Sequence, residues 1–283
     1  MKVLSGRELA EFIKQRQAHE VRSLYQSYGA VPKLAIIVTV EHPAIETYMR
    51  MKQRYGADIG VDVKVHRMNL TEVKNGSQAL NADPNVHGII VQLPLSDPVQ
   101  TDEIVDLIDP IKDVDALGSR ATLDPATPTA ILWLLAGYNI DLAGKKIVLI
   151  GRGKLVGAPL ERMLLASGYE VVVVDRSTKD LSVINQADVI VTATGQPGIL
   201  SSVMIKPGAV VVDAGVAGEH GKTVGDLADD VRQRIDLKIT PEKGGVGPLT
   251  ICALFDNVLR TTRKQVTVSD STEGAEPANY RAR

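Results

Sequence analysis

Short apolar runs rich in Val and Ile alternate with helix-like segments along most of this chain, and this alternation limits the folds available to it. Two strands joined through a helix form a parallel pair, because the helix carries the chain back to the same edge of the sheet. We therefore predict an α/β fold with parallel sheets. The first half of the chain has expected strands at residues 34–40, 61–66 and 88–93 and expected helices at 6–28, 44–59, 71–81 and 102–109.

The chain is long enough for two domains, since its 283 residues exceed the roughly 100–200 residues of a single domain. Prolines at positions 110, 125 and 128 interrupt the first series. A second series has expected strands at 146–150, 170–175, 189–194 and 209–213, a helix at 156–167 and a returning helix from Leu249 to about Arg263. We predict a first α/β domain at 1–118 and 250–265, a Rossmann-like dinucleotide-binding domain at 119–249 and a disordered, polar tail at 266–283.

Composition excludes several classes of protein. The 32 basic and 34 acidic side chains leave a net charge of −2, which does not favour a nucleic-acid partner. The longest apolar runs are far shorter than the roughly 18 residues that a membrane span requires. The single cysteine, Cys252, cannot form an intramolecular disulfide, and the five histidines show no metal-ligand spacing. Without a signal-peptide pattern in its first residues, we expect a cytoplasmic protein with no metal site and no membrane partner.

A glycine-rich turn lies between the expected strand at 146–150 and the expected helix at 156–167. It contains Gly151, Gly153 and Gly157 and is one residue longer than the G-x-G-x-x-G pattern. Glycine lets the backbone turn tightly and approach a pyrophosphate, whose charge is favourable at a helix N-terminus. This context favours a dinucleotide site, and the alternative is a tight turn that binds nothing.

Two opposite signals bear on the choice of dinucleotide. Asp175 ends the next strand, near the position from which an acidic residue binds the adenosine ribose of NAD. Arg152 in the turn and Arg176 after the strand are placed to bind the 2′-phosphate of NADP, although each arginine alone could be a solvated surface charge. Two charge-assisted hydrogen bonds outweigh one to a ribose, so we predict NADP, with NAD as the alternative.

A lysine stands in the apolar stripe of the helix expected at 44–59. Lys52 lies four residues after Tyr48, so both side chains project from one helix face and can reach a common ligand. Gln92 stands near the C-terminal end of a strand, the edge at which parallel sheets bind ligands. The segment 112–115 adds carboxylates that accept hydrogen bonds from a heterocycle. The plain alternatives are a lysine that extends its ammonium to water and a solvated turn.

Six segments together resemble the bifunctional methylenetetrahydrofolate dehydrogenase/cyclohydrolase family. They occur in the family's order and span roughly residues 1–265. The segments are Tyr48-Met49-Arg50-Met51-Lys52, Val91-Gln92-Leu93-Pro94-Leu95, Lys112-Asp113-Val114-Asp115, Pro125-Ala126-Thr127-Pro128, the turn from Gly151-Arg152 to Pro159, and Gly244-Gly245-Val246-Gly247-Pro248-Leu249-Thr250.

The resemblance implies a folate-binding first domain, an NADP-binding second domain, a cleft between them, and a homodimer that serves one-carbon and purine metabolism. The implied enzyme oxidises methylenetetrahydrofolate to methenyltetrahydrofolate with NADP and hydrolyses that product to 10-formyltetrahydrofolate. By position, Lys52 is the central catalytic residue and Gln92 its partner, while Asp115 anchors the pterin and Tyr48 stacks on it. A lysine with a pKa lowered by burial transfers protons as water adds.

The resemblance also supplies the remaining expected contacts. The expected substrate contacts are Leu93, Gly244, Gly245 and Pro248, in addition to Tyr48, Lys52, Gln92 and Asp115. The expected cofactor contacts are Gly151, Arg152, Gly153, Val156, Gly157, Asp175, Arg176, Thr194, Gly195, Gly215 and Val216.

Several positions depart from the family's usual residues. Gly153 replaces a serine and Ala116 a glycine, Ala126 replaces a cysteine and Lys243 a proline, and the segment 175–178 lacks the usual histidine. Two other functions therefore stand beside the bifunctional enzyme: a dehydrogenase without the hydrolytic step and a non-catalytic dinucleotide-binding regulator. Lys52 and Gln92 argue against the first, and the complete set with Tyr48 and Asp115 argues against the second.

Overall fold

The computed structural model describes residues 2–219 and 222–273, and its contacts divide the chain into two compact units. The large-sheet unit consists of Met1–Lys14 and Asp124–Leu254, and the small-sheet unit of Gln15–Leu123 and Phe255–Arg283. The first fourteen residues thus group with the second series of strands, not with the first domain expected at 1–118. The reason is that β1 (Lys2–Val3) pairs in parallel with β11 (Lys238–Ile239).

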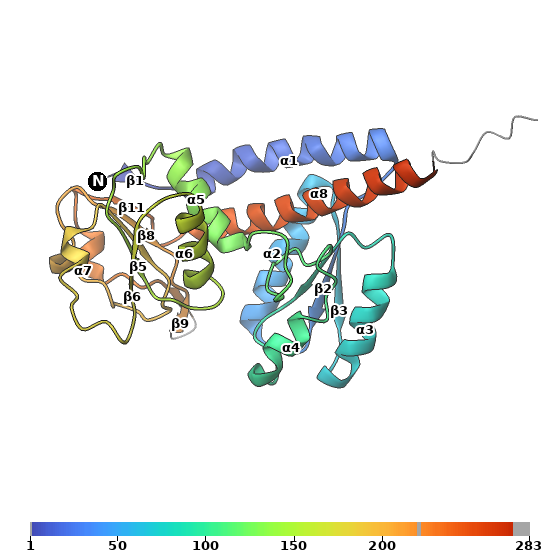
Figure 1. Ribbon diagram of the computed structural model, residues 1–283, viewed down its shortest axis with the longest axis horizontal. Helices are drawn as coiled ribbons and strands as arrows, with labels where there is room; N and C mark the ends of the chain where they lie inside the picture. The colour runs from blue at the N-terminus through green and yellow to red at the C-terminus, as the bar shows by residue number, and fades with distance from the viewer. Residues whose placement is uncertain (1, 220–221, 274–283) are drawn as a thin grey trace, which may run out of the picture. The chain divides into compact units, whose positions relative to one another are not determined.

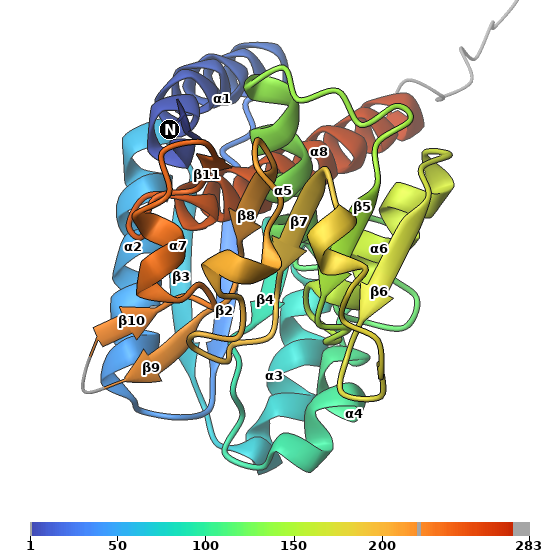
Figure 2. The ribbon, with the colours of Figure 1, turned by 90° about the vertical axis from the view of Figure 1, so that its left-hand side faces the viewer.

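The large-sheet unit is built on six parallel strands in the order β1-β11-β8-β7-β5-β6 (Figure 2). The sequence predicts four of these six strands, which are β5 (Ile147–Ile150), β6 (Val171–Val174), β7 (Val189–Thr192) and β8 (Val210–Asp213). Val148, Ile190 and Val211 lie at the centre of the core and are fully buried. Such continuous apolar runs are typical of parallel strands with both faces covered. Its helices are α5 (Ala126–Gly137), α6 (Gly157–Ala166) and α7 (Asp229–Arg232), with 3-10 turns η2 (Ile184–Gln186) and η3 (Ser202–Met204).

The small-sheet unit is built on three parallel strands in the order β3-β2-β4 (Figure 2), and Figure 1 labels its helices α2, α3 and α4. They are β2 (Lys33–Val38), β3 (Asp62–Arg67) and β4 (Gly88–Val91), followed in turn by α2 (Pro43–Ile59), α3 (Leu70–Ala82), and the short η1 (Pro98–Gln100) and α4 (Thr101–Val105). Ala35, Ile37 and Ile89 pack against apolar side chains of α3 and α4. An Asn69 capping box starts α3, because the Asn69 side chain accepts from Glu72 and the Glu72 carboxylate accepts from Asn69.

Two long helices, α1 (Gly6–Tyr28) and α8 (Val246–Glu273), contribute residues to both units. The sequence predicts the bounds of α1, but α8 begins earlier and continues to Glu273. Residues 266–273 of the expected disordered tail are therefore helical, which corrects that expectation, and residues 274–283 lie outside the described ranges. The expected helix at 102–109 is shorter than predicted, because the chain after Val105 continues in turns with i→i−3 hydrogen bonds.

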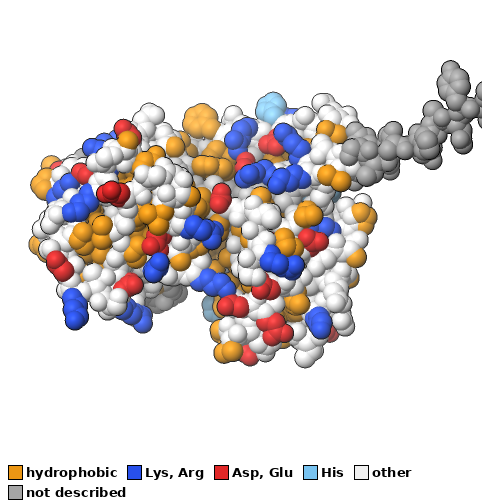
Figure 3. Space-filling view, in the orientation of Figure 1, with side chains coloured by type: hydrophobic (Ala, Val, Ile, Leu, Met, Phe, Trp, Pro, Cys, Tyr) orange, Lys and Arg blue, Asp and Glu red, His pale blue; other side chains and the backbone are white. Residues whose placement is uncertain are grey.

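β9 (Ala217–Glu219) and β10 (Lys222–Val224) form an antiparallel hairpin that was not expected from the sequence. Within the described ranges, no helix is long and apolar enough to cross a membrane. On the face drawn in Figure 3, Lys and Arg side chains are interspersed with Asp and Glu, as the near-zero net charge predicts.

Candidate functional site

The glycine-rich turn of the large-sheet unit joins β5 to α6, as predicted. Gly151 has a φ of 99°, and a Cβ there would lie 2.7 Å from the carbonyl oxygen of Ala193. A Cβ on Gly157 would collide with the carbonyl oxygen of Gly151, whereas a Cβ on Gly153 would meet nothing within 4 Å. Two of the three glycines are therefore required by the backbone itself, and the third, Gly153, is not.

The end of α6 at this turn is suited to an anion. Val156 precedes the helix and makes no side-chain capping bond, and the first turn holds no acidic residue. Backbone N–H groups at such an end lack intrahelical partners, and the helix dipole favours negative charge there. The turn therefore fits the pyrophosphate of a dinucleotide.

Three loops meet at the carboxyl edge of the large sheet. A Cβ added to each loop glycine shows how close the loops lie. A Cβ on Gly151 would lie 2.9 Å from the side chain of Thr194, and one on Gly195 would lie 3.3 Å from the carbonyl oxygen of Val216. The loops after β5, β7 and β8 are therefore neighbours. The structure thus places Thr194, Gly195, Gly215 and Val216 in loops that adjoin one another at the edge where Gly151 begins the turn.

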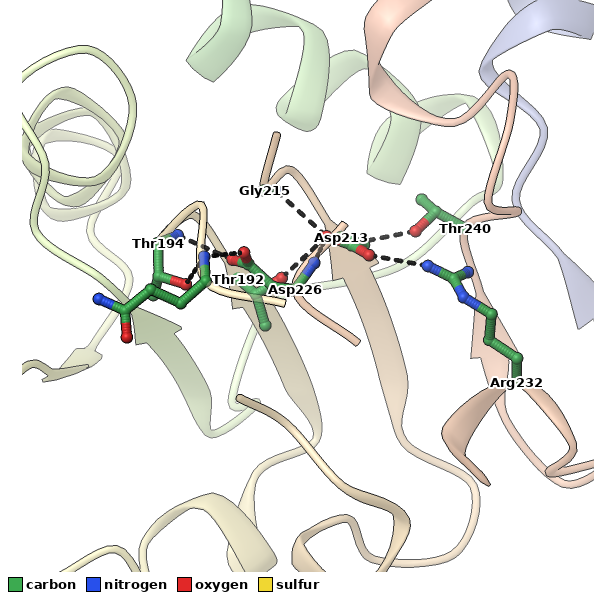
Figure 4. A network of polar contacts seen from close by, with 8 residues as sticks. Thr192, Thr194, Asp213, Gly215, Asp226, Arg232 and Thr240 are labelled. Atoms are coloured by element: carbon green, nitrogen blue, oxygen red, sulfur yellow. Dashed lines mark hydrogen bonds and ion pairs between the residues drawn. The ribbon is translucent and has the colours of Figure 1, made fainter. Parts of the chain in front are cut away.

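Two buried carboxylates hold these loops, and sequence reasoning missed both (Figure 4). Asp226 is fully buried, and its two oxygens accept the backbone N–H groups of Thr194 at 2.7 Å and Gln196 at 2.9 Å. Asp213 ends β8 and accepts the N–H groups of Gly215 at 3.1 Å and Asp226 at 3.0 Å. The available signal was an aspartate directly after an apolar strand and another directly after a glycine.

The side chains expected at the adenosine end have separate partners. Arg152 forms a two-point ion pair with Glu161 of α6, with its Nε 2.7 Å from Oε2. The Asp175 carboxylate accepts from the backbone N–H and hydroxyl of Ser177, which lowers its pKa. Arg176 has no hydrogen-bond or ion-pair partner among the described residues. The two arginines expected to converge are thus engaged differently, and Arg176 is the one left for a ligand.

In the small-sheet unit, the predicted pair of Lys52 and Gln92 is in direct contact. The Lys52 Nζ donates to the Gln92 Oε1 at 2.9 Å, and the Gln92 Nε2 donates to the Leu93 carbonyl at 2.9 Å. Lys52 comes from the middle of α2 and Gln92 directly follows β4. Tyr48, one helical turn before Lys52, is 41% exposed.

The electrostatics of this cluster favour uncharged forms. Burial of the Lys52 ammonium lowers its pKa, and the carboxylate of Asp115 opposes that shift. Burial raises the pKa of Asp115, and the lysine opposes it in turn. The larger cause is burial for both groups, so each binds or releases a proton nearer to neutral pH than usual.

The segment 112–115 is a buried loop and not a solvated turn. The Lys112 Nζ donates to three carbonyls at the end of α3, those of Leu80, Asn81 and Asp83. The backbone of Lys112 accepts from Ile89 of β4 at 2.7 Å, which brings the loop beside that strand. Asp115 is thereby held near the end of β4, where Gln92 begins the next loop.

The loop that carries Asp115 is fixed by two further polar side chains. The Asp113 carboxylate accepts from the backbone N–H of Ala116 at 3.0 Å and of Gly118 at 2.9 Å. From α8, the buried Asn257 donates to the Val114 carbonyl at 2.9 Å. Ala116 has a φ of 56°, a left-handed conformation that explains why a glycine is usual there.

The remaining expected substrate residues differ in their placement. Leu93 is half-buried and follows Gln92 in the small-sheet unit. Gly244, Gly245 and Pro248 belong to the large-sheet unit, where the Gly244 carbonyl accepts from the N–H of Arg7 at 3.0 Å. The described residues contain no group of three or more His, Cys, Asp or Glu that could hold a metal ion.

Comparisons with known proteins agree with both units. The family described as tetrahydrofolate dehydrogenase/cyclohydrolase matches with its catalytic domain at residues 4–115 and its NAD(P)-binding domain at residues 125–266. A curated relative from Desulforamulus reducens, described as bifunctional protein FolD, is 37% identical over 94% of this chain and 98% of its own.

Two solved structures are similar over almost their full length. The bifunctional FolD methylenetetrahydrofolate dehydrogenase/cyclohydrolase of Campylobacter jejuni has a TM-score of 0.87 at 36% identity and covers 93% of this chain and 99% of its own. The Trypanosoma brucei enzyme, solved in complex with NADP cofactor and inhibitor, has a TM-score of 0.87 at 30% identity and covers 93% and 98%.

Proposed function

The chain belongs to the tetrahydrofolate dehydrogenase/cyclohydrolase family, and from that premise we propose the reactions and the residues that perform them. The protein oxidises methylenetetrahydrofolate to methenyltetrahydrofolate with NADP and hydrolyses the product to 10-formyltetrahydrofolate. The observation that carries the hydrolytic half is the partly buried hydrogen bond of Lys52 to Gln92, beside the charge of Asp115.

NADP fits the carboxyl edge of the large sheet. The turn from Gly151 to Gly157 and the uncapped start of α6 suit the pyrophosphate, and Arg176 is available for the 2′-phosphate. NADP bound there supplies the hydride acceptor for the oxidation. The remaining candidate contacts on the chain are Arg152, Gly153, Val156, Asp175, Thr194, Gly195, Gly215 and Val216.

The folate substrate fits the small-sheet cluster. The exposed ring of Tyr48 can stack on the pterin, and Asp115 can accept hydrogen bonds from its ring nitrogens and amino group. Leu93 adds apolar contact, and the resemblance separately adds Gly244, Gly245 and Pro248 as candidate substrate residues. These assignments place the one-carbon unit near the Lys52 amine.

Lys52 is the proton-transfer group of the hydrolysis. Water adds to the methenyl carbon, forming a C–O bond, and the proton it loses passes to the neutral Lys52 amine. The C–N5 bond then breaks, and N5 takes the electron pair and accepts that proton. The hydroxyl on the former methenyl carbon releases its proton to solvent as the C=O bond forms, and the formyl group remains on N10. Burial lowers the pKa of Lys52, and a lower pKa favours the neutral amine, which does not repel a cationic substrate as an ammonium would.

One assay separates this proposal from its two alternatives. The purified chain receives methylenetetrahydrofolate and NADP, and reduced cofactor and methenyl product are followed together. We expect reduced cofactor to form while the methenyl product passes on to the formyl product. Accumulation of the methenyl product would indicate a dehydrogenase alone, and no turnover would indicate a non-catalytic dinucleotide-binding protein.

We also propose that the protein is a homodimer joined through its large-sheet unit. The outermost strand β6 leaves Val172 at 39% exposure, and Leu165 of α6 is 53% exposed. An open apolar strand edge is a template for pairing with a second copy. Light scattering after size exclusion should give a dimer for the wild type and a monomer for Val172→Lys, and a wild-type monomer would overturn the proposal.

Cytoplasmic localisation stays a proposal as well. It rests on the single cysteine, Cys252, which is buried and cannot form an intramolecular disulfide. Cell fractionation with an antibody against the chain would test it, and recovery outside the cytoplasmic fraction would overturn it.

A further inference from the structure

We infer that Asp226, supported by Asp213, is a positioning residue for the nicotinamide half of the cofactor. Asp226 acts through the backbone of the turn Thr194-Gly195-Gln196, and Asp213 acts through the backbone of Gly215. The inference rests on the proposed NADP site. It adds to that site the carboxylates of Asp213 and Asp226, which bind the backbone of the loops and are not among the expected cofactor contacts.

The strand order tells which half of the cofactor these loops face. In the order β8-β7-β5-β6, the glycine-rich turn follows β5 and Asp175 follows β6. The acidic residue after the second strand of such a unit marks the adenosine side, so the pyrophosphate lies over β5 and the nicotinamide extends to the other side. The loops after β7 and β8 are on that other side, directly beside Gly151.

Asp226 determines the shape of the turn after β7. Each of its carboxylate oxygens accepts one backbone N–H, from Thr194 and from Gln196, and between them Gly195 has a φ of 64°. Its burial raises its pKa, and these N–H donors oppose the shift. Without the carboxylate the backbone N–H groups of Thr194 and Gln196 would have to find other partners, and the turn would lose its geometry.

Asp213 holds Asp226 in place. Its Oδ1 accepts from the backbone N–H of Asp226 and of Gly215, and its Oδ2 accepts from Arg232 of α7 at 3.0 Å (Figure 4). The backbone N–H of Asp213 donates to the Thr240 hydroxyl at 2.9 Å. The order of support therefore runs from Arg232 through Asp213 to Asp226.

Two glycines show how closely the carboxylates and loops interlock. A Cβ on Gly215 would overlap the Asp226 carboxylate, and a Cβ on Gly225 would overlap the Asp213 carboxylate. Each carboxylate thus lies against the backbone of the other's segment. A shift of one carboxylate moves both the turn after β7 and the segment at Gly215, which are the two segments proposed to contact the nicotinamide.

The test uses Asp226→Asn in the full-length chain. The amide keeps one acceptor oxygen and turns an NH2 group toward the second backbone N–H, so the turn loses one of its two bonds. We expect the Kd and KM for NADP to rise about tenfold or more, because a charge-assisted bond is replaced by a donor–donor contact. Hydrolysis of supplied methenyltetrahydrofolate should stay within about twofold of wild type, because that reaction uses no dinucleotide.

The matched control is Asp188→Asn. Asp188 also accepts a backbone N–H, that of Lys146 at 2.8 Å, and pairs with Lys206 at 2.6 Å, but it stands before β7 at the opposite edge of the sheet. It should change the melting temperature without changing the Kd for NADP. Arg232→Gln is the second test variant if Asp226→Asn fails to fold, and it should raise the Kd for NADP by a smaller factor.

The outcomes are distinct. A raised Kd and KM for NADP with intact methenyl hydrolysis supports the inference. An unchanged Kd for NADP in folded Asp226→Asn, or in Arg232→Gln where only that variant folds, overturns it, as does an equal loss of both activities. Failure of the proposed function is seen separately, because the wild-type chain would then bind no NADP or produce no reduced cofactor.

Discussion

The loops at the carboxyl edge of the large sheet and the Lys52 cluster of the small-sheet unit differ in the groups that they offer to a ligand: mainly backbone groups in the first and side chains in the second. At the sheet edge, the groups proposed to face the pyrophosphate and the nicotinamide are backbone groups, and the side chain of Asp226 holds that backbone. In the Lys52 cluster, the backbone holds side chains, and the ammonium of Lys52 and the carboxylate of Asp115 have shifted pKa values of their own.

This difference predicts how each region responds to substitution. A site of backbone groups is sensitive to any added Cβ and tolerant of changes in functional groups that face away from it. A site of side chains loses its chemistry when one functional group is removed, even if volume is conserved. The four predictions below test that contrast, beginning with the largest effect.

Lys52→Met should lower the cyclohydrolase rate by about a hundredfold or more, because general acid–base catalysis typically contributes that much. The fold should remain intact, since methionine keeps the apolar stem and removes a buried charge. Stopped assays of methenyl hydrolysis and a melting curve measure the two effects. Arg54→Met, an exposed change on the same helix, is the control.

Unchanged methenyl hydrolysis in folded Lys52→Met would contradict the side-chain site. A variant that binds folate normally but cannot hydrolyse it would support it most directly, because the loss then lies in the chemistry and not in binding.

Gly157→Ala should destabilise the turn and lower the affinity for NADP, because its Cβ would meet the carbonyl oxygen of Gly151. Overpacking of this kind costs about 1–3 kcal/mol of unfolding free energy. Denaturant unfolding and NADP titration are the measurements. Gly247→Ala is the control, since a Cβ at that position, outside the turn, meets nothing within 4 Å. Equal effects of the two changes would refute the backbone reading of the turn.

The features that could be predicted from the sequence are those formed by one contiguous segment of the chain. The glycine-rich turn is contiguous, so its strand, turn and helix could be predicted directly. Helix spacing and the strand edge predicted a common ligand for Lys52 and Gln92, and the family resemblance predicted their pairing. The support from Asp213 and Asp226 could not be predicted, because it depends on two loops meeting in space. The pairing of β1 with β11 depends on residues more than 200 positions apart, so no local signal reveals it.

The charges at the adenosine end show the same limit. Arg152 and Arg176 look equivalent in the sequence, but α6 brings Glu161 to Arg152 and leaves Arg176 without a partner among the described residues. Only the helix geometry distinguishes them.

Arg176→Ala should therefore raise the KM for NADP about tenfold while hardly affecting NAD, because it removes a charge-assisted bond to the 2′-phosphate. Initial rates with both cofactors measure this. Arg162→Ala, which removes an exposed charge from α6, is the control. If Arg176→Ala weakens both cofactors equally, or if the wild type prefers NAD, then Asp175 decides specificity and the phosphate reading is wrong.

The mildest effect is expected from Asp115→Asn on the pH dependence of hydrolysis. Burial lowers the pKa of Lys52, and the Asp115 charge partly restores it, so removal of that charge leaves burial unopposed and lowers the pKa further. The active form is the neutral amine, which increases as pH rises through this pKa. The rising limb of kcat against pH should move to lower pH, measured at saturating folate so that weaker pterin binding does not enter.

Asp62→Asn is the control, because it removes an acidic charge from β3 of the same unit and should leave the limb in place. A limb that stays fixed or moves to higher pH in Asp115→Asn would show that Lys52 is not the titrating group, and the side-chain site would then need another base.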